Sequence, residues 1–149
     1  GMTMACLGSM TFKRRKHLRG LEPDQCYWFA HEVQIRNKDR IDFHVDPPPD
    51  LVLEIDISRS SVNRMAIYGV MGVPEVWRYR NQKIAFLARQ PDGRYTEIPQ
   101  SLSLPPLAPS DLLPFLAMRH SADEIAIVRQ FRAWVLQKFP AGGATPPGP

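Results

Sequence analysis

The chain has 149 residues, of which 44% are hydrophobic and 23% are charged, and this length and composition suit one globular domain with a core of its own. No apolar run reaches the roughly 18 residues that a membrane-spanning helix needs, and the N-terminus lacks the apolar segment of a signal peptide, so the sequence argues against membrane insertion. The two cysteines form neither a CxxC pair nor a Cys/His cluster with zinc spacing, and we expect a protein of the reducing cytoplasm.

The charge of the chain permits a nucleic-acid partner but does not require one, since the net charge is +4 and the pI about 9.3. Five of the nine residues in 12–20 are Lys or Arg, a density that could bind phosphates. A solvated loop or helix face explains this segment equally well. The Gly- and Pro-rich residues 141–149 are typical of a disordered tail, which leaves residues 1–140 as a single domain.

Extended segments are expected to dominate the first third of the chain. Residues 26–30 are aromatic and follow a turn sequence, which predicts a buried strand. Two more extended segments are expected around 32–35 and 41–45. Three prolines at 47–49 then interrupt the pattern, and the apolar run with acids at 50–57 predicts the next strand.

A helix followed by a meander is predicted for the middle of the chain. Ser60 is a suitable N-cap and Gly72 a suitable C-cap, with apolar residues at helical spacing between them. The segments 73–80, 83–89 and 93–98 alternate or run apolar around turn residues, which predicts three antiparallel strands.

Two helices are predicted after a Pro-rich link, over 109–118 and 121–139. In the second, Ser121 and Glu124 have the spacing of a capping box, and apolar residues recur at helical spacing. We expect this last helix to pack on the sheet.

The acids of the segment PPPDLVLEIDISRSS, residues 47–61, raise the main question of the sequence. Alternate side chains of a strand point to opposite faces, so Glu54 and Asp56 share one face while Leu53 and Ile55 share the other. Same-face neighbours are roughly 7 Å apart, and each of two like charges disfavours ionisation of the other. Water, a basic partner or a divalent cation could offset that cost.

Three segments, EPDQCYWF (22–29), PPDLVLEIDIS (48–58) and YGVMGVPEVWRY (68–79), follow one another in this chain. Together they resemble the Uma-two family of restriction-endonuclease-like proteins, and the resemblance extends from about residue 8 to residue 138. It implies the PD-(D/E)XK nuclease fold, in which a central sheet flanked by helices holds a metal ion between carboxylates of neighbouring strands. It also implies that the family's N-terminal helix, which offers another acid, is missing here.

The resemblance implies roles for individual residues. Asp24 and Glu54 would bind Mg²⁺ or Mn²⁺ together with the backbone carbonyl of Ile55, and the cation would polarise a phosphate and activate water. Asp56 stands where the fold has a lysine, and would be a ligand or orient the water. Arg64 stands where many relatives have a lysine in the next helix, and would contact the scissile phosphate without acting as a base.

Structural interpretations compete with several of these roles. Asp24 also fits a Pro-Asp turn, and Asp50 fits a cap at the start of its strand. Asp56 is equally suited to an ion pair with Arg59 or Arg64. Glu54 is the strongest metal-site candidate, because an unpaired charge in the middle of a strand is costly to bury.

Trp77 and Tyr79 lie on one face of a predicted strand, where they could stack on bases, although core packing is the favoured interpretation. We expect an α+β protein with a mixed, twisted central sheet flanked by helices, acting as a Mg²⁺-dependent endonuclease on DNA. The alternatives are a catalytically impaired member of the same fold that binds nucleic acid, and a homodimeric interaction module paired through edge strands within 76–88.

Overall fold

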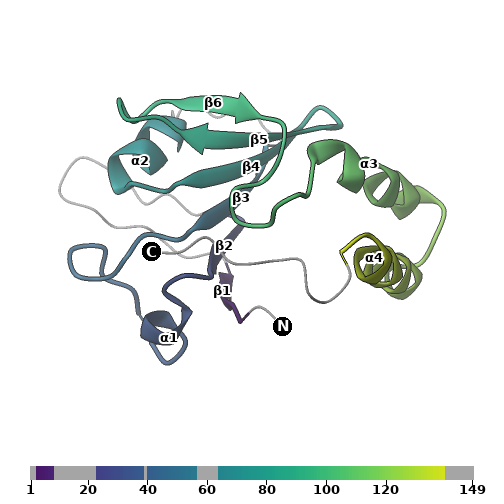
Figure 1. Cartoon of the computed structure of the whole chain (residues 1–149), viewed down its shortest axis with the longest axis horizontal. Coiled ribbons are helices and arrows are strands. Elements are labelled where there is room, and N and C mark those ends of the chain that lie inside the picture. The colour runs from purple at the N-terminus through teal and green to yellow at the C-terminus, as the bar shows by residue number, and fades with distance from the viewer. Residues whose placement is uncertain (1–2, 9–22, 39, 57–63, 140–149) are drawn as a thin grey trace.

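The computed structural model describes residues 3–8, 23–38, 40–56 and 64–139, which form one sheet with helices around it (Figure 1). The elements in chain order are β1 (Ala5–Gly8), β2 (Gln25–Trp28), α1 (Glu32–Ile35), β3 (Leu51–Asp56), α2 (Arg64–Met71), β4 (Glu75–Arg80), β5 (Lys83–Arg89), β6 (Tyr95–Ile98), α3 (Pro109–Ala117), the 3₁₀ helix η1 (Met118–His120) and α4 (Glu124–Lys138).

The six strands lie in the sheet in chain order, from β1 at one edge to β6 at the other. β3 and β4 are parallel, with α2 as the connection between them, and each of the other neighbouring pairs is antiparallel. The mixed sheet with flanking helices confirms the predicted α+β class and is consistent with a restriction-endonuclease-like core.

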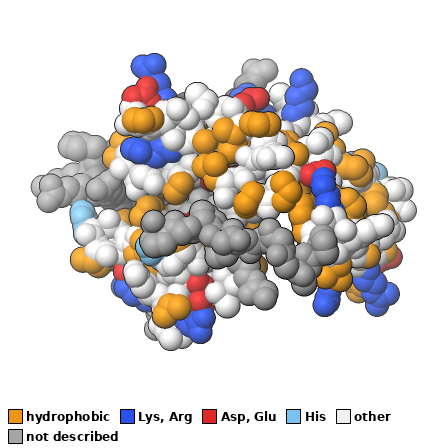
Figure 2. Space-filling model, in the orientation of Figure 1, with side chains coloured by type: hydrophobic (Ala, Val, Ile, Leu, Met, Phe, Trp, Pro, Cys, Tyr) orange, Lys and Arg blue, Asp and Glu red, His pale blue; other side chains and the backbone are white. Residues whose placement is uncertain are grey.

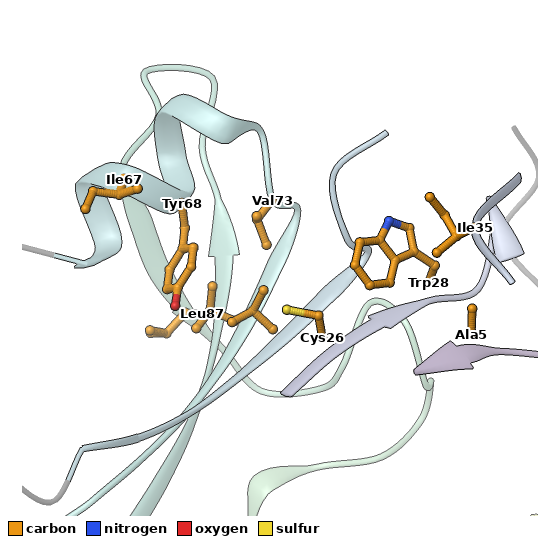
Figure 3. Packing of buried hydrophobic residues seen from close by; sticks show 10 residues of the cluster. Ala5, Cys26, Trp28, Ile35, Ile67, Tyr68, Val73 and Leu87 are labelled. Atoms are coloured by element: carbon orange, nitrogen blue, oxygen red, sulfur yellow. The ribbon is translucent and has the colours of Figure 1, made fainter. Parts of the chain in front are cut away.

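The two faces of the sheet carry separate hydrophobic clusters. One cluster joins the sheet to α2 and α1, and Figure 3 shows Tyr68 of α2 reaching down beside Leu87, with Cys26 and Trp28 of β2 in the same layer. The other cluster lies toward α3 and α4 and has the stacked pair Trp77 and Phe86 in it. Residues from both faces of β3 are therefore buried, and the face that carries Glu54 is covered by α2.

The turns of the predicted meander take the backbone geometry that their sequence favours. Asn81 and Gln82 between β4 and β5 have φ of 50° and 60°, the left-handed pair of a tight hairpin turn. Gly72 ends α2 with φ of 82°, a conformation that costs glycine little. These findings confirm the three strands and the end of the preceding helix. Its predicted start at Ser60 lies outside the described residues.

The predicted extended segment at 32–35 is wrong, because these residues form the helical turn α1. Arg36 donates two hydrogen bonds to the carboxylate of Glu32 across one turn, an (i, i+4) pair that only helical geometry brings together. Ile35 is buried in the core below this turn.

The predicted extended segment at 41–45 is also wrong, because turns occupy it. The Asp42 carboxylate accepts a hydrogen bond from the backbone N–H of His44 at 2.9 Å, and the Asp46 carboxylate accepts one from the N–H of Asp42 at 2.8 Å. Local bonds of this kind compete with pairing in a sheet.

Trp134 of α4 packs against the second cluster, and the aromatic residues of α4 contact Phe115 of α3. The predicted capping box is wrong: Asp123 is the N-cap, and its carboxylate accepts a hydrogen bond from the N–H of Ala126 at 2.9 Å. Apolar residues nevertheless remain exposed on α4, and Figure 2 shows hydrophobic side chains across the middle of one face and on the side where α3 and α4 lie.

The homodimer prediction took strands within 76–88 as edge strands, and this is wrong for the described sheet. β4 and β5 are interior strands with a neighbour on each side, and the edges of the described sheet are β1 and β6. Homodimerisation itself stays a prediction. The basic segment 12–20, Arg59 and the tail 141–149 lie outside the described residues.

A close backbone contact fixes α2 over the sheet. An ideal Cβ on Gly69 would lie 2.0 Å from the carbonyl oxygen of Gly93, in the turn between β5 and β6. Around this contact Arg89 donates from Nε to the Gly69 carbonyl at 2.8 Å, and the Tyr95 hydroxyl donates to the Val73 carbonyl at 2.6 Å. The hairpin thus sets the position of the helix that carries Arg64 and Tyr68.

Gly69→Ala should therefore lower the free energy of unfolding by about 1–3 kcal/mol, because the added methyl group meets backbone that cannot move aside cheaply. Helix propensity alone would change stability in the opposite direction by about 1 kcal/mol. The measurement is urea denaturation. Val70→Ala, at the next and exposed position, should stay within about 0.5 kcal/mol of the parent. A Gly69→Ala variant as stable as the parent would contradict the close contact.

Candidate functional site

The candidate site lies where β2, β3 and α2 meet. Asp24 directly precedes β2, Glu54 lies in β3, and Arg64 and Tyr68 lie one helical turn apart on α2. The connection between β3 and β4 brings the helix back over the strand that it follows. Four residues that are far apart in the sequence thus approach one another.

Glu54 is almost completely buried, with 2% of its surface exposed. Its Oε2 accepts a hydrogen bond from Nη1 of Arg64 at 2.5 Å, and its Oε1 accepts one from the hydroxyl of Tyr68. Burial raises the pKa of Glu54, while the bonds from Tyr68 and Arg64 act in the opposite direction. In the described structure, a basic partner, Arg64, and a hydroxyl, that of Tyr68, thus offset the charge of Glu54.

Tyr68 is the residue of this site to which the sequence assigned no role. Its side chain is fully buried, and Figure 3 shows its ring pointing from α2 to the sheet with the hydroxyl at the tip. Burial, followed by the bond to Glu54, raises the pKa of Tyr68 far above its ordinary value, so the hydroxyl remains a donor. The available signal was its spacing, because Arg64 and Tyr68 are an (i, i+4) pair on one helix face.

Asp24 is hydrogen-bonded to the same strand. Its Oδ2 accepts a hydrogen bond from the backbone N–H of Ile55 at 2.7 Å, directly after Glu54, while the residue itself is exposed. The negative charge of Asp24 contributes to raising the pKa values of both Glu54 and Arg64. Asp24 therefore does more than form a turn: it is an exposed carboxylate within electrostatic reach of a buried one.

The donor types of Asp24 and Glu54 are those that Mg²⁺ takes. Mg²⁺ is commonly bound by one or two carboxylates, with water and phosphate oxygens as its other ligands. Asp24 and Glu54 supply two hard oxygen donors, one exposed and one buried. Within residues 3–8, 23–38, 40–56 and 64–139, no group of three or more His, Cys, Asp or Glu is suited to a metal ion. The backbone places Asp56 at the end of β3, but its side chain is not described.

The thiol nearest this site is not a nucleophile. Cys26 is buried in β2, and burial, with smaller contributions from Cys6 and Glu54, raises its pKa well above the ordinary range. A protonated buried thiol is chemically inert.

Other sequence candidates have structural roles. The Oδ2 of Asp50 accepts hydrogen bonds from the backbone N–H groups of Phe29 at 2.6 Å and Ala30 at 3.0 Å, so it ties the end of β2 to the start of β3. Trp77 is stacked on Phe86 with ring centroids 4.2 Å apart and an interplanar angle of 11°, which supports the core-packing interpretation.

Comparison with known proteins identifies the family. The model of the Uma2 family, described as "Putative restriction endonuclease", matches residues 1–121. The chain belongs to the Uma2 family. Neither a curated protein nor a solved structure matches it. Family membership agrees with the resemblance in the sequence and supports a nuclease at a coarse level. None of the described helices is long and apolar enough to span a membrane.

Tyr68→Phe should lower the free energy of unfolding by about 1.5–3 kcal/mol at neutral pH, because Oε1 of Glu54 loses a donor inside the core. The measurement is urea denaturation of the purified chain. Tyr79→Phe is a matched control on β4, since the Tyr79 side chain is only partly buried. Equal effects of the two variants would contradict the bond to Glu54.

Stability should also depend on the protonation of Glu54. Since its pKa is raised above its ordinary value of 4.5, the protonated form is favoured in the folded state, and its contribution is lost as pH rises through the raised folded pKa. Glu54→Gln removes this dependence. The unfolding free energy of Glu54→Gln minus that of the parent should therefore increase with pH above 4.5 and then level off. A difference that decreases with pH would mean that the pKa is lowered instead.

Proposed function

We propose that this protein is an endonuclease that hydrolyses DNA phosphodiester bonds with the help of Mg²⁺ or Mn²⁺, and that Asp24 and Glu54 are the metal ligands. The family to which the chain belongs supports a nuclease. The observation that carries the assignment of residues is the hydrogen bond from the Ile55 N–H to Asp24, since it brings an exposed carboxylate to the strand position next to Glu54.

The metal would supply two effects that the side chains of this site lack. A bound divalent cation polarises the phosphate and lowers the pKa of an attacking water. Asp24 and Glu54 would hold it together with the backbone carbonyl of Ile55, and Asp56 would assist as a ligand or orient the water.

Arg64 would neutralise charge on the scissile phosphate. Its guanidinium has five N–H donors, and the described bond to Glu54 is made from Nη1. About a third of its side chain is exposed, at 35%. Glu54 raises the already high pKa of Arg64, so this residue binds phosphate as a permanent cation and does not remove a proton from water.

A second candidate function follows from the burial of Glu54. Both of its oxygens accept hydrogen bonds from α2, and this arrangement stabilises the fold without any metal. A chain that uses Glu54 in this way would be a catalytically impaired member of the fold that binds nucleic acid. The two candidates differ in whether a divalent cation binds at Glu54.

The test combines metal binding with cleavage. Calorimetry with Mn²⁺ and cleavage of supercoiled plasmid in Mg²⁺ or Mn²⁺ are measured for the parent, Asp24→Asn and Glu54→Gln. We expect the cleavage rate to fall by about 100-fold or more in both variants. Substitution of residues that only hydrogen-bond to metal ligands already lowers activity or metal affinity by about 10–100-fold. Glu124→Gln, an exposed acid in the first turn of α4, should cleave like the parent.

The outcomes separate the two candidates. A parent that binds DNA but neither binds Mn²⁺ nor cleaves plasmid would support the impaired member and reject the nuclease. Cleavage that survives in Glu54→Gln and Asp24→Asn would reject these residues as the metal ligands.

A further inference from the structure

A polar hollow lies beside the candidate site, between α2 and the hairpin of β5 and β6. It has a volume of about 660 Å³, and side chains from α2, β4, β5 and β6 and from the turn between β5 and β6 line it. Three of its lining residues are arginines: Arg78, Arg89 and Arg94. The two acids on its wall are Asp92 and Glu97, so positive charge is in excess.

Arg78 is the arginine most directly linked to the candidate site. It is paired in register with Glu54 on the neighbouring parallel strand, so the two residues lie on the same face, with strands about 4.8 Å apart. Its side chain is half-buried. Among the described residues, none forms a hydrogen bond or an ion pair with the side chain of Arg78. A half-buried guanidinium without an acidic partner keeps donors that an anion can accept from.

The other two arginines are already engaged in part. Arg89 donates from Nε to the carbonyl of Gly69, and Arg94 lies 3.7 Å from Asp92 on an exposed turn. Their remaining donors add positive charge to the hollow. Arg78 therefore is the expected main contact, with Arg89 and Arg94 in support.

The arginines are spread along the sheet rather than gathered around one point. Arg78 is paired in register with Ala85 of β5, and Arg89 lies four residues further along that strand, roughly 13 Å away at the rise of a strand. Successive charges on one strand of duplex DNA are about 3.4 Å apart along the axis. A polymer of phosphates suits this spacing better than a single small anion.

We propose that this hollow binds backbone phosphates of a nucleic-acid strand, with Arg78 as the main contact. The proposal rests on the proposed function in so far as the ligand is nucleic acid. α2 joins the two regions, because Arg64 and Tyr68 lie at Glu54 while Met65, Ala66 and Gly69 line the hollow. A strand whose scissile phosphate lies at Asp24 and Glu54 would place a neighbouring part of its backbone on Arg78.

The test measures binding without cleavage. Fluorescence anisotropy of a labelled 20-nucleotide DNA, single-stranded and duplex, is recorded for the full chain in EDTA over a series of salt concentrations. Arg78→Gln should raise the Kd about 3- to 10-fold. The slope of log K against log [salt] should fall by about 0.9 for duplex and about 0.7 for single-stranded DNA, the change expected for one lost phosphate contact. Arg78→Lys keeps the charge and should restore the slope.

Arg132→Gln is the matched control, since it removes one positive charge from an exposed position of α4, outside the hollow. Its Kd should stay within twofold of the parent. Thermal melting checks that each variant is folded. Equal Kd values and slopes for Arg78→Gln and Arg132→Gln would overturn the proposal. Displacement of the labelled DNA by inorganic phosphate or dAMP, at the same millimolar concentration of phosphate groups as an unlabelled DNA competitor, would also overturn it.

Failure of this proposal is distinguishable from failure of the proposed function. If the parent cleaves plasmid and Arg78→Gln binds DNA normally, the hollow is not the phosphate site, and the nuclease stands. If the parent binds DNA through Arg78 but cleaves nothing, the phosphate site stands, and the nuclease assignment fails.

Discussion

The buried carboxylate of Glu54 is the constraint around which this structure is arranged. An ionisable group with 2% exposure is costly to bury unless its charge is offset, and α2 offsets it twice, with the Arg64 guanidinium and the Tyr68 hydroxyl. This requirement fixes the face that α2 turns to the sheet. The contact of Gly69 with Gly93 fixes how closely the helix approaches, so two sets of contacts hold α2 over the sheet.

The same arrangement explains why family membership and catalytic competence are separate questions here. The family match supports a nuclease at a coarse level, whereas the described structure shows Glu54 accepting hydrogen bonds at both oxygens. Asp24 differs, because it is exposed and tied to β3 through a backbone N–H. The two carboxylates therefore differ in access, because Asp24 is open to solvent and α2 covers Glu54.

The sequence predicted most of the elements whose signals are local. The left-handed turn at Asn81 and Gln82 and the glycine that ends α2 followed from backbone preferences of single residues. The segments 32–35 and 41–45 were predicted wrongly for the same kind of reason, because pairs such as Glu32 with Arg36 and Asp42 with Asp46 select helical or turn geometry over an apolar pattern. The N-cap of α4 was predicted two residues too early. Ser121 and Asp123 are both residue types that cap helices well, and the folded backbone makes Asp123 the cap.

By itself, the sequence determined the family, the α+β class and the position of an acid in the middle of a strand, because these depend on residue order and on the alternation of side chains along β3. Only the tertiary structure decided that both faces of this strand are packed and that Tyr68 joins Arg64 in holding Glu54. It also decided that Arg78 stands beside Glu54. The physical reason is that parallel strands separated by a helix acquire their register only when the helix packs. Contacts across the sheet therefore cannot be predicted from local sequence.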